Sequence, residues 1–120
     1  MAGCQGNLQI VFDIREYTNL KTDYRLYDQL NGSLGSVMDN IAEGFERNGN
    51  REFIQFLSVS KAPCGEARSQ LYRVLDRGYI NEDDFEIYKF KVISLSKQIS
   101  GFMHYLQKSD LKGTKFKDRN

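Results

Sequence analysis

Few side chains in this sequence could carry catalytic chemistry, and their spacing argues against it. The single histidine, His104, has Ser100 and Lys108 one helical turn away, where a metal site would need another histidine or a carboxylate. The carboxylates to consider are Glu43, Glu66 and the run Glu82, Asp83, Asp84 and Glu86. That run suits the positive end of a helix dipole better than a metal ion. Because Glu-x-x-His pairs, glycine-rich phosphate loops and nucleophile motifs are also missing, we predict no catalytic, cofactor-binding or metal-binding residue and no enzyme activity.

The basic residues indicate a different chemistry, the binding of phosphate groups. The candidates are Arg47, Arg51, Lys61, Arg68, Arg73 and Arg77, together with Lys112, Lys115 and Lys117 near the C-terminus. Residues 108–120 hold 5 Lys or Arg against 2 Asp, whereas residues 1–107 hold 12 against 14 Asp or Glu. Acidic residues interrupt the central set at Glu52, Glu66 and Asp76. Two interpretations stay open: a surface that binds nucleic acid, which a ring of subunits would multiply, or ordinary solvated faces and a solvated terminus.

The length and composition are those of one globular domain. The 120 residues, 28% of them charged, suffice for one hydrophobic core and are too few for two. No run approaches the roughly 20 apolar residues that span a bilayer, and no basic region precedes the short apolar run near the N-terminus. Cys4 and Cys64 lie far apart and indicate neither a disulfide framework nor a zinc site. We therefore expect a cytoplasmic protein that does not enter a membrane.

Apolar periodicity predicts three long helices. Asn81 would cap the last of them, about 25 residues long, whose apolar stripe alternates spacings of three and four through Phe85, Tyr88, Val92, Leu95, Ile99, Phe102 and Leu106. A second helix over 50–77 would be capped by Asn50, bend at Pro63 and end before Gly78. A third would run from about residue 24 to residue 46.

The segment NLQIVFDIREYTNL, which precedes these helices, fits a short first helix or, taken alone, a strand. A lone strand would have no pairing partner, so helical neighbours favour the helix. Four helices with short turns predict an all-α, antiparallel up-and-down four-helix bundle over residues 1–108. Residues 109–120 would follow as a basic, flexible tail.

Two stretches of the sequence resemble one known family. NIAEGFER supplies Asn40, Ile41, Ala42, Glu43 and Gly44, and REFIQFLSVSKAPCGEARSQL, followed by LDRGYI, supplies Phe53, Phe56, Leu57, Glu66 and Gln70. These residues look like those of the four-helix-bundle proteins encoded in intervening sequences of bacterial large-subunit ribosomal RNA genes. That family is related to the accessory variability proteins of diversity-generating retroelements. The resemblance covers residues 8–108.

The resemblance implies a bundle that assembles as a ring-shaped homopentamer. It also implies a role in binding RNA or DNA for some members and, in one branch, a nucleic-acid enzyme, a reverse transcriptase, as partner. This chain departs from the family pattern, because Asn31 and Gly32 stand where a basic pair is usual and Gln55 replaces a common basic residue. The usual tryptophan of the first helix is also missing. These departures reduce the number of positive charges on the surface that would bind phosphate.

Glu43 and Gly44 raise a question, because neither a charge nor a glycine is favoured within a packed helix. Glu43 can pair with Arg47 one turn later, or it can turn toward Arg51, Arg68 or a backbone end near the following turn. Gly44 can allow a neighbouring helix to approach closely. We predict that both residues are structural.

The sequence holds more aromatic residues than the core stripes can bury, namely Tyr17, Tyr24, Tyr27, Tyr72, Tyr79, Phe90 and Tyr105. Grouped at the surface, such residues would mark subunit contacts. Phe90 lies two positions from both Tyr88 and Val92, which places it on the far side of its helix. We therefore predict a non-catalytic oligomeric bundle that binds nucleic acid or acts as an accessory scaffold. The alternative is a protein–protein assembly module without nucleic-acid binding.

Overall fold

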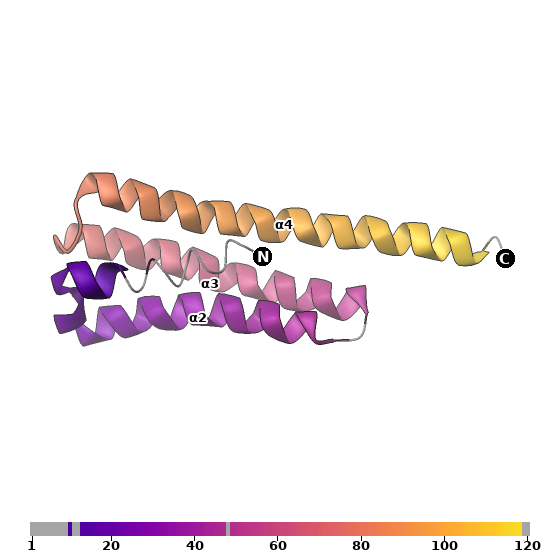
Figure 1. The fold of residues 1–120 in the computed structure, drawn as a ribbon, viewed down its shortest axis with the longest axis horizontal. Helices are drawn as coiled ribbons and strands as arrows, with labels where there is room; N and C mark the ends of the chain where they lie inside the picture. The colour runs from indigo at the N-terminus through magenta and orange to yellow at the C-terminus, as the bar shows by residue number, and fades with distance from the viewer. Residues whose placement is uncertain (1–9, 11–12, 48, 119–120) are drawn as a thin grey trace.

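The computed structural model describes residue 10 and residues 13–47 and 49–118 (Figure 1). Side chains are described up to Ser109. Its long helices are α2 (Tyr24–Phe45), α3 (Asn50–Asp76) and α4 (Glu82–Asp118). A 3₁₀ turn, η1 (Asn19–Thr22), precedes them, and the backbone is helical at residues 10 and 13–17. The described residues contain no strand, so the prediction of an all-α fold with a short first helix is confirmed.

Helix α3 is the middle helix of the arrangement. It packs against α2 on one side and α4 on the other, and it runs antiparallel to both (Figure 1). Consecutive helices are antiparallel neighbours because only a few residues join α2 to α3 and α3 to α4. Within the described residues, no helix combines the length and the apolar character that crossing a bilayer requires.

The core forms two clusters along the bundle. The first includes Ile10 and Ile14, whose side chains are fully buried against residues of α2, α3 and α4. The second lies toward the α2–α3 turn and holds Leu57, Leu95 and Ile99. Each buried Leu or Ile contributes roughly 1.5–3 kcal/mol relative to exposure. The predicted stripe of α4 is buried at the positions of Phe85, Val92, Leu95, Ile99 and Leu106.

The connection from α3 to α4 agrees with its sequence signals. Gly78 has φ +77°, and its N–H donates to the carbonyl of Leu75 at 2.9 Å. The N–H of Tyr79 donates to the carbonyl of Val74 at 3.1 Å, which completes a Schellman motif. The side chain of Asn81 accepts from the N–H of Asp84 at 2.7 Å, as predicted for the N-cap of the last helix.

The start of α3 differs from the prediction. Asn50 is the first helical residue, and the N-cap is Gly49, which has φ +114° and makes no side-chain hydrogen bond. A glycine is needed at that position because an L side chain rarely adopts such a positive φ. The helix runs without a break through Pro63, so the prediction of a single helix across KAPCGE is confirmed, while the bend at Pro63 stays a prediction.

The end of α4 also differs from the predicted boundary at residue 108. The helix continues to Asp118 and extends well beyond the turn between α2 and α3 (Figure 1). Adding residues to a formed helix requires no new nucleation, since each one gains a backbone hydrogen bond. Residues 109–118 therefore continue α4 rather than forming a separate segment.

Asp23 joins the start of α2 to the end of α3. Its side chain accepts from the N–H of Leu26 at 3.4 Å, from Nη1 of Arg77 at 2.6 Å and from the hydroxyl of Tyr79 at 3.0 Å. The hydrogen bond from Arg77 lowers the pKa of the Asp23 carboxyl, although burial acts in the opposite sense. The same arrangement raises the pKa of Tyr79, mainly through its hydrogen bond to Asp23.

Helices α2 and α3 approach each other closely at Gly44. A Cβ added at this position would lie 2.7 Å from Cβ of Phe56 and 3.0 Å from Cδ1 of Phe53. The Cβ of Phe56 is attached directly to the backbone of α3, so it cannot move aside by a rotamer change. The predicted role of Gly44 in a close helix contact is thus confirmed. Gly32 and Gly35, by contrast, have open space where a Cβ would stand.

Gly44→Ala should lower the free energy of unfolding by about 1–3 kcal/mol, because overpacking outweighs the gain in helix propensity. Gly32→Ala is the matched control: it lies in the exposed middle of α2 and should raise stability by up to about 1 kcal/mol. Urea unfolding of both variants at one protein concentration measures the difference. Equal stabilisation by the two substitutions would mean that α2 and α3 do not approach at Gly44.

Asp23→Asn should destabilise the protein at neutral pH, because asparagine keeps a capping oxygen but loses the charge that faces Arg77. The lowered folded-state pKa means that the contribution of Asp23 is present above the unfolded value of about 3.9 and is lost as the pH falls through the folded value. Urea unfolding midpoints at neutral and acid pH should therefore converge for wild type and variant. The exposed Asp28→Asn serves as the control, and a gap that persists in acid would contradict the assignment.

Candidate nucleic-acid and subunit interfaces

Gly44 and Arg47 of NIAEGFER pack against Phe56, and Glu43 pairs with Arg47. Oε1 of Glu43 accepts from Nη2 of Arg47 at 2.8 Å, which confirms the i to i+4 pair and not the alternatives with Arg51 or Arg68. The guanidinium carbon of Arg47 lies 5.3 Å from the ring centroid of Phe56. Phe56 in turn packs at Gly44. Glu43 is therefore an exposed residue that orients Arg47, which answers why a charge follows the apolar residues of this helix.

The remaining motif residues divide between packing and surface. Asn40 is half-buried and donates from Nδ2 to the carbonyl of Ser36 at 2.8 Å. Ile41 and Phe53 pack at the edge of the second core cluster, while Ala42 and Glu66 are exposed. Gln70 is half-buried, and its Oε1 has no hydrogen-bond partner among the described residues. The motif thus builds the α2–α3 contact and leaves polar groups at its outer edge.

Two hollows lie along the outer groove between α2 and α3. The first has a volume of about 360 Å³ and is lined by Asn40, Arg47, Glu52, Gln55, Phe56 and Val59. The second, of about 560 Å³, is lined by Gln29, Ala62, Gly65, Glu66, Ser69, Gln70 and Arg73. Val59 is apolar and 53% exposed at the first hollow. Shallow hollows with an exposed apolar residue between polar ones suit another protein surface better than a small ligand.

Four of the six predicted cations on α3 or next to its ends already have partners within the subunit. Arg77 is paired with Asp23, and Arg47 with Glu43. Nη1 of Arg73 donates to Oε1 of Gln29 at 3.4 Å, and Nζ of Lys61 donates to Oγ of Ser100 on α4.

The structure therefore does not gather the predicted α3 cations into one patch. Lys61 and Arg68 line a small hollow of about 120 Å³ between α3 and α4. Arg51 is exposed elsewhere, at the start of α3.

The C-terminal lysines lie on the projecting end of α4. The backbone at Lys112, Lys115 and Lys117 is helical, and these positions follow the last buried residue of the described side chains, Leu106. The charged run at the start of the same helix occupies its first turn, where Glu82, Asp83 and Asp84 favour the dipole. Among the described residues, no three His, Cys, Asp or Glu side chains are placed to hold a metal ion.

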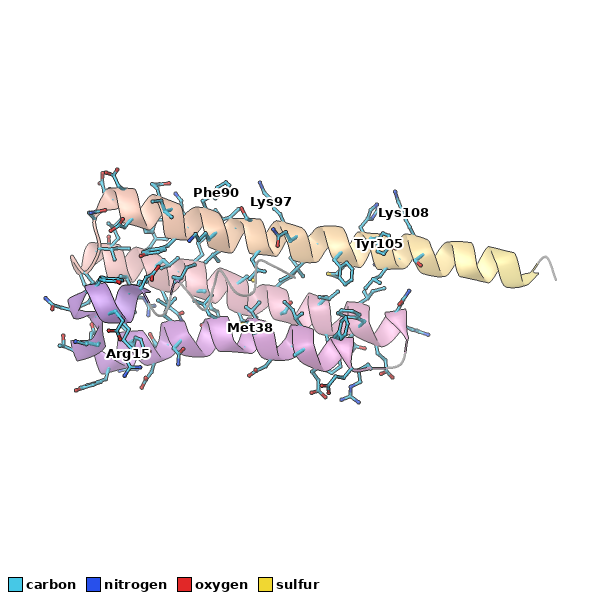
Figure 2. All side chains as sticks on the ribbon, viewed as in Figure 1. Arg15, Met38, Phe90, Lys97, Tyr105 and Lys108 are labelled. Carbon is cyan, nitrogen blue, oxygen red and sulfur yellow. The ribbon has the colours of Figure 1, made fainter. Side chains whose placement is uncertain are left out.

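Several of the extra aromatic residues are exposed. Phe90 is 70% exposed, as its position opposite Tyr88 and Val92 predicts, and the neighbouring Ile87 on α4 is 52% exposed. Figure 2 shows Phe90 on the outer edge of α4, away from α2. Tyr17, Tyr24 and Tyr105 are also largely exposed, while Tyr79 is held by Asp23 and Tyr27 packs against the core.

Sequence reasoning missed an aromatic chain that closes the bundle near the α2–α3 turn. Phe45 lies edge-on to Phe53 at 5.9 Å between ring centroids, Phe53 lies edge-on to Phe102 at 5.3 Å, and Phe102 stacks on Tyr105 at 6.1 Å. Phe45, Phe53 and Phe102 each belong to a predicted apolar stripe of their own helix, and Tyr105 does not. Their contact with one another was missed, because it can be recognised only once the ends of the three helices are placed side by side.

The comparisons with known proteins agree with this architecture. One solved structure is a crystal structure of a protein of unknown function from the S23 ribosomal protein family of Bacteroides thetaiotaomicron, with a TM-score of 0.74 and 18% sequence identity. The alignment covers 84% of this chain and 94% of that one, which shows a shared fold. The comparison with curated proteins gave no match. A family model described as 23S rRNA-intervening sequence protein matches residues 5–101, and the chain therefore belongs to the 23S rRNA-intervening sequence protein family.

Proposed function

We propose that this protein is a non-catalytic, cytoplasmic scaffold that assembles from several copies of itself. The observation that carries the proposal is the pair of unlike surfaces left open by the subunit. One is the apolar outer edge of α4 at Ile87 and Phe90, and the other is the hollowed groove between α2 and α3 that contains Val59. Large apolar side chains at such exposure favour burial against a partner.

Contact between unlike surfaces is heterologous, and a heterologous contact with the right rotation closes into a ring. The family resemblance implies that the ring is a homopentamer. A groove with polar walls and an apolar residue within it supports this geometry, because subunit interfaces combine an apolar centre with a polar rim. The residues of the family motif supply several of the groove's walls, namely Asn40, Phe56, Glu66 and Gln70.

Phe90→Asp should reduce the assembled mass while leaving helicity almost unchanged, because Phe90 is outside the subunit core and a buried aspartate at an interface is costly. Light scattering after size exclusion measures the mass, and circular dichroism measures the helicity. Gln98→Asp, at an exposed polar position of the same helix, adds the same charge and should leave the mass unchanged. An unchanged mass for Phe90→Asp would remove Phe90 from the interface.

We also propose that the assembled scaffold binds RNA. The family description connects these proteins with an intervening sequence of 23S rRNA, which makes RNA the nucleic acid to test first. A ring repeats every cation of the subunit around its axis, so a weak positive potential on one copy becomes a useful one on the assembly. The scaffold would then present RNA to a nucleic-acid enzyme, as the resemblance to the accessory variability proteins implies.

Fluorescence anisotropy of a labelled RNA hairpin should show binding that weakens steeply between about 50 and 200 mM salt, because phosphate contacts release counterions. Duplex DNA of equal length measures the preference for RNA. If the anisotropy of the hairpin does not change even at about 50 mM salt, the proposal of RNA binding is wrong, and the protein is an assembly module without a nucleic-acid role.

A further inference from the structure

Charge is segregated along α4. Its acidic residues before Asp110 all lie within Glu82–Glu86, and residues 87–109 contain no Asp or Glu. The same 23 residues contain four lysines and His104. The helix dipole favours lysine only within the last turn of a helix. It does not explain Lys97 and Lys108, which stand 21 and 10 residues before the end of α4 at Asp118.

Helical spacing places two of these lysines and His104 on one face. Lys97, His104 and Lys108 follow at intervals of seven and four residues, and all three are exposed. Figure 2 shows Lys97 and Lys108 on the outer edge of α4, pointing away from α2. Positions 112 and 115, both lysines, lie four and seven residues after Lys108 in the same helix and so share its register. The α4 basic stripe is defined here as Lys97, His104, Lys108, Lys112 and Lys115.

The α4 basic stripe differs from the cations of α3 in its surroundings. The α3 set is interleaved with Glu52, Glu66 and Asp76, and several of its members are bonded within the subunit. Lysines one turn apart, such as Lys108 and Lys112, repel each other and disfavour the helix that carries them. Between Lys97 and Lys115 the acidic residue is Asp110, which stands neither three nor four residues from any member of the stripe, and Asp118 lies one turn after Lys115 only. A polyanion bound along the outer edge of the helix would relieve the repulsion.

The shape of the stripe suits a double-helical polyanion. From Lys97 to Lys115 there are 18 steps along the helix, or about 27 Å. The second half of the stripe lies on the part of α4 that projects beyond α2 and α3, so a rigid rod can lie along it without meeting the rest of the subunit (Figure 1). An interfacial membrane helix would need a continuous apolar face. Beyond Leu106, the positions that continue the core stripe of α4 are Ser109, Asp110, Gly113 and Lys117, which are polar or small.

We propose that the α4 basic stripe holds the phosphate backbone of an RNA stem. The inference rests on the proposed RNA binding and assigns its site. Lysine is a point charge without the planar fork that reads bases, so recognition would follow the shape and backbone of the stem and not its sequence. In this arrangement the stem contacts the outer edge of α4, and the predicted α3 cations keep their partners within the subunit.

The test compares three triple variants of the full chain, each with three positive charges removed. The first is Lys97→Gln with Lys108→Gln and Lys112→Gln in the stripe. The second is Arg51→Gln with Lys61→Gln and Arg68→Gln on α3. The third, the control, is Arg15→Gln with Lys21→Gln and Arg25→Gln, exposed positions at the opposite end of the molecule (Figure 2). Anisotropy of a labelled RNA hairpin is measured over a salt series, with helicity and assembled mass checked for each variant.

The stripe variant should bind the hairpin roughly tenfold or more weakly at about 50 mM salt, and its salt slope should fall by about three, one for each lysine removed. The α3 and control variants should keep the wild-type slope. If the α3 variant loses binding while the stripe variant binds like wild type, the α4 basic stripe is not the RNA site, but the proposed RNA binding still holds. A wild-type protein that binds no RNA would overturn both. Tighter binding to duplex DNA or to anionic vesicles than to the hairpin would overturn the choice of partner.

Discussion

The close approach of α2 and α3 at Gly44 is the constraint on which the rest of the structure depends. A side chain at that position would meet Phe56 at its Cβ, so the two backbones can come together only because glycine is there. The approach lets Phe56 pack against α2, and Arg47, held by Glu43, then covers the ring. With α3 fixed against α2, its opposite side is available to α4, which makes α3 the middle helix of the bundle.

The charged and polar residues of the family motif take part in local contacts of the subunit. Glu43 orients Arg47 by accepting its hydrogen bond, and Asn40 donates to a backbone carbonyl of its own helix. An exposed ion pair of this kind contributes roughly 0.5 kcal/mol or less to the free energy of unfolding. Its main effect is therefore to position the guanidinium group of Arg47. The functional surface must then be sought where the subunit leaves groups unsatisfied: the α2–α3 groove, with the unpaired Oε1 of Gln70 among the described residues, and the outer edge of α4.

Local signals predicted most of the fold, and long-range contacts account for what they missed. The Asn81 cap, the Gly78 terminus and the α4 stripe depend on residues within a few positions of one another, and all three were predicted. Which cations remain available could not be predicted, because Arg73 is bonded to Gln29 and Arg77 to Asp23 across 44 and 54 residues of chain. The extension of α4 beyond residue 108 was missed for a related reason: a polar sequence continues a helix only when a packed segment has already nucleated it.

The two proposed roles place compatible demands on one helix. Phe90 and Lys97 lie seven residues apart on the same edge of α4, so the apolar half of that edge precedes its basic half. A subunit contact at Phe90 would leave the basic half uncovered. In a cyclic ring every copy has the same orientation relative to the axis, so the projecting ends of α4 would all emerge on the same side. The basic stripes would then act together on one stem, which converts weak phosphate contacts into a strong, salt-sensitive attachment without any base-specific contact.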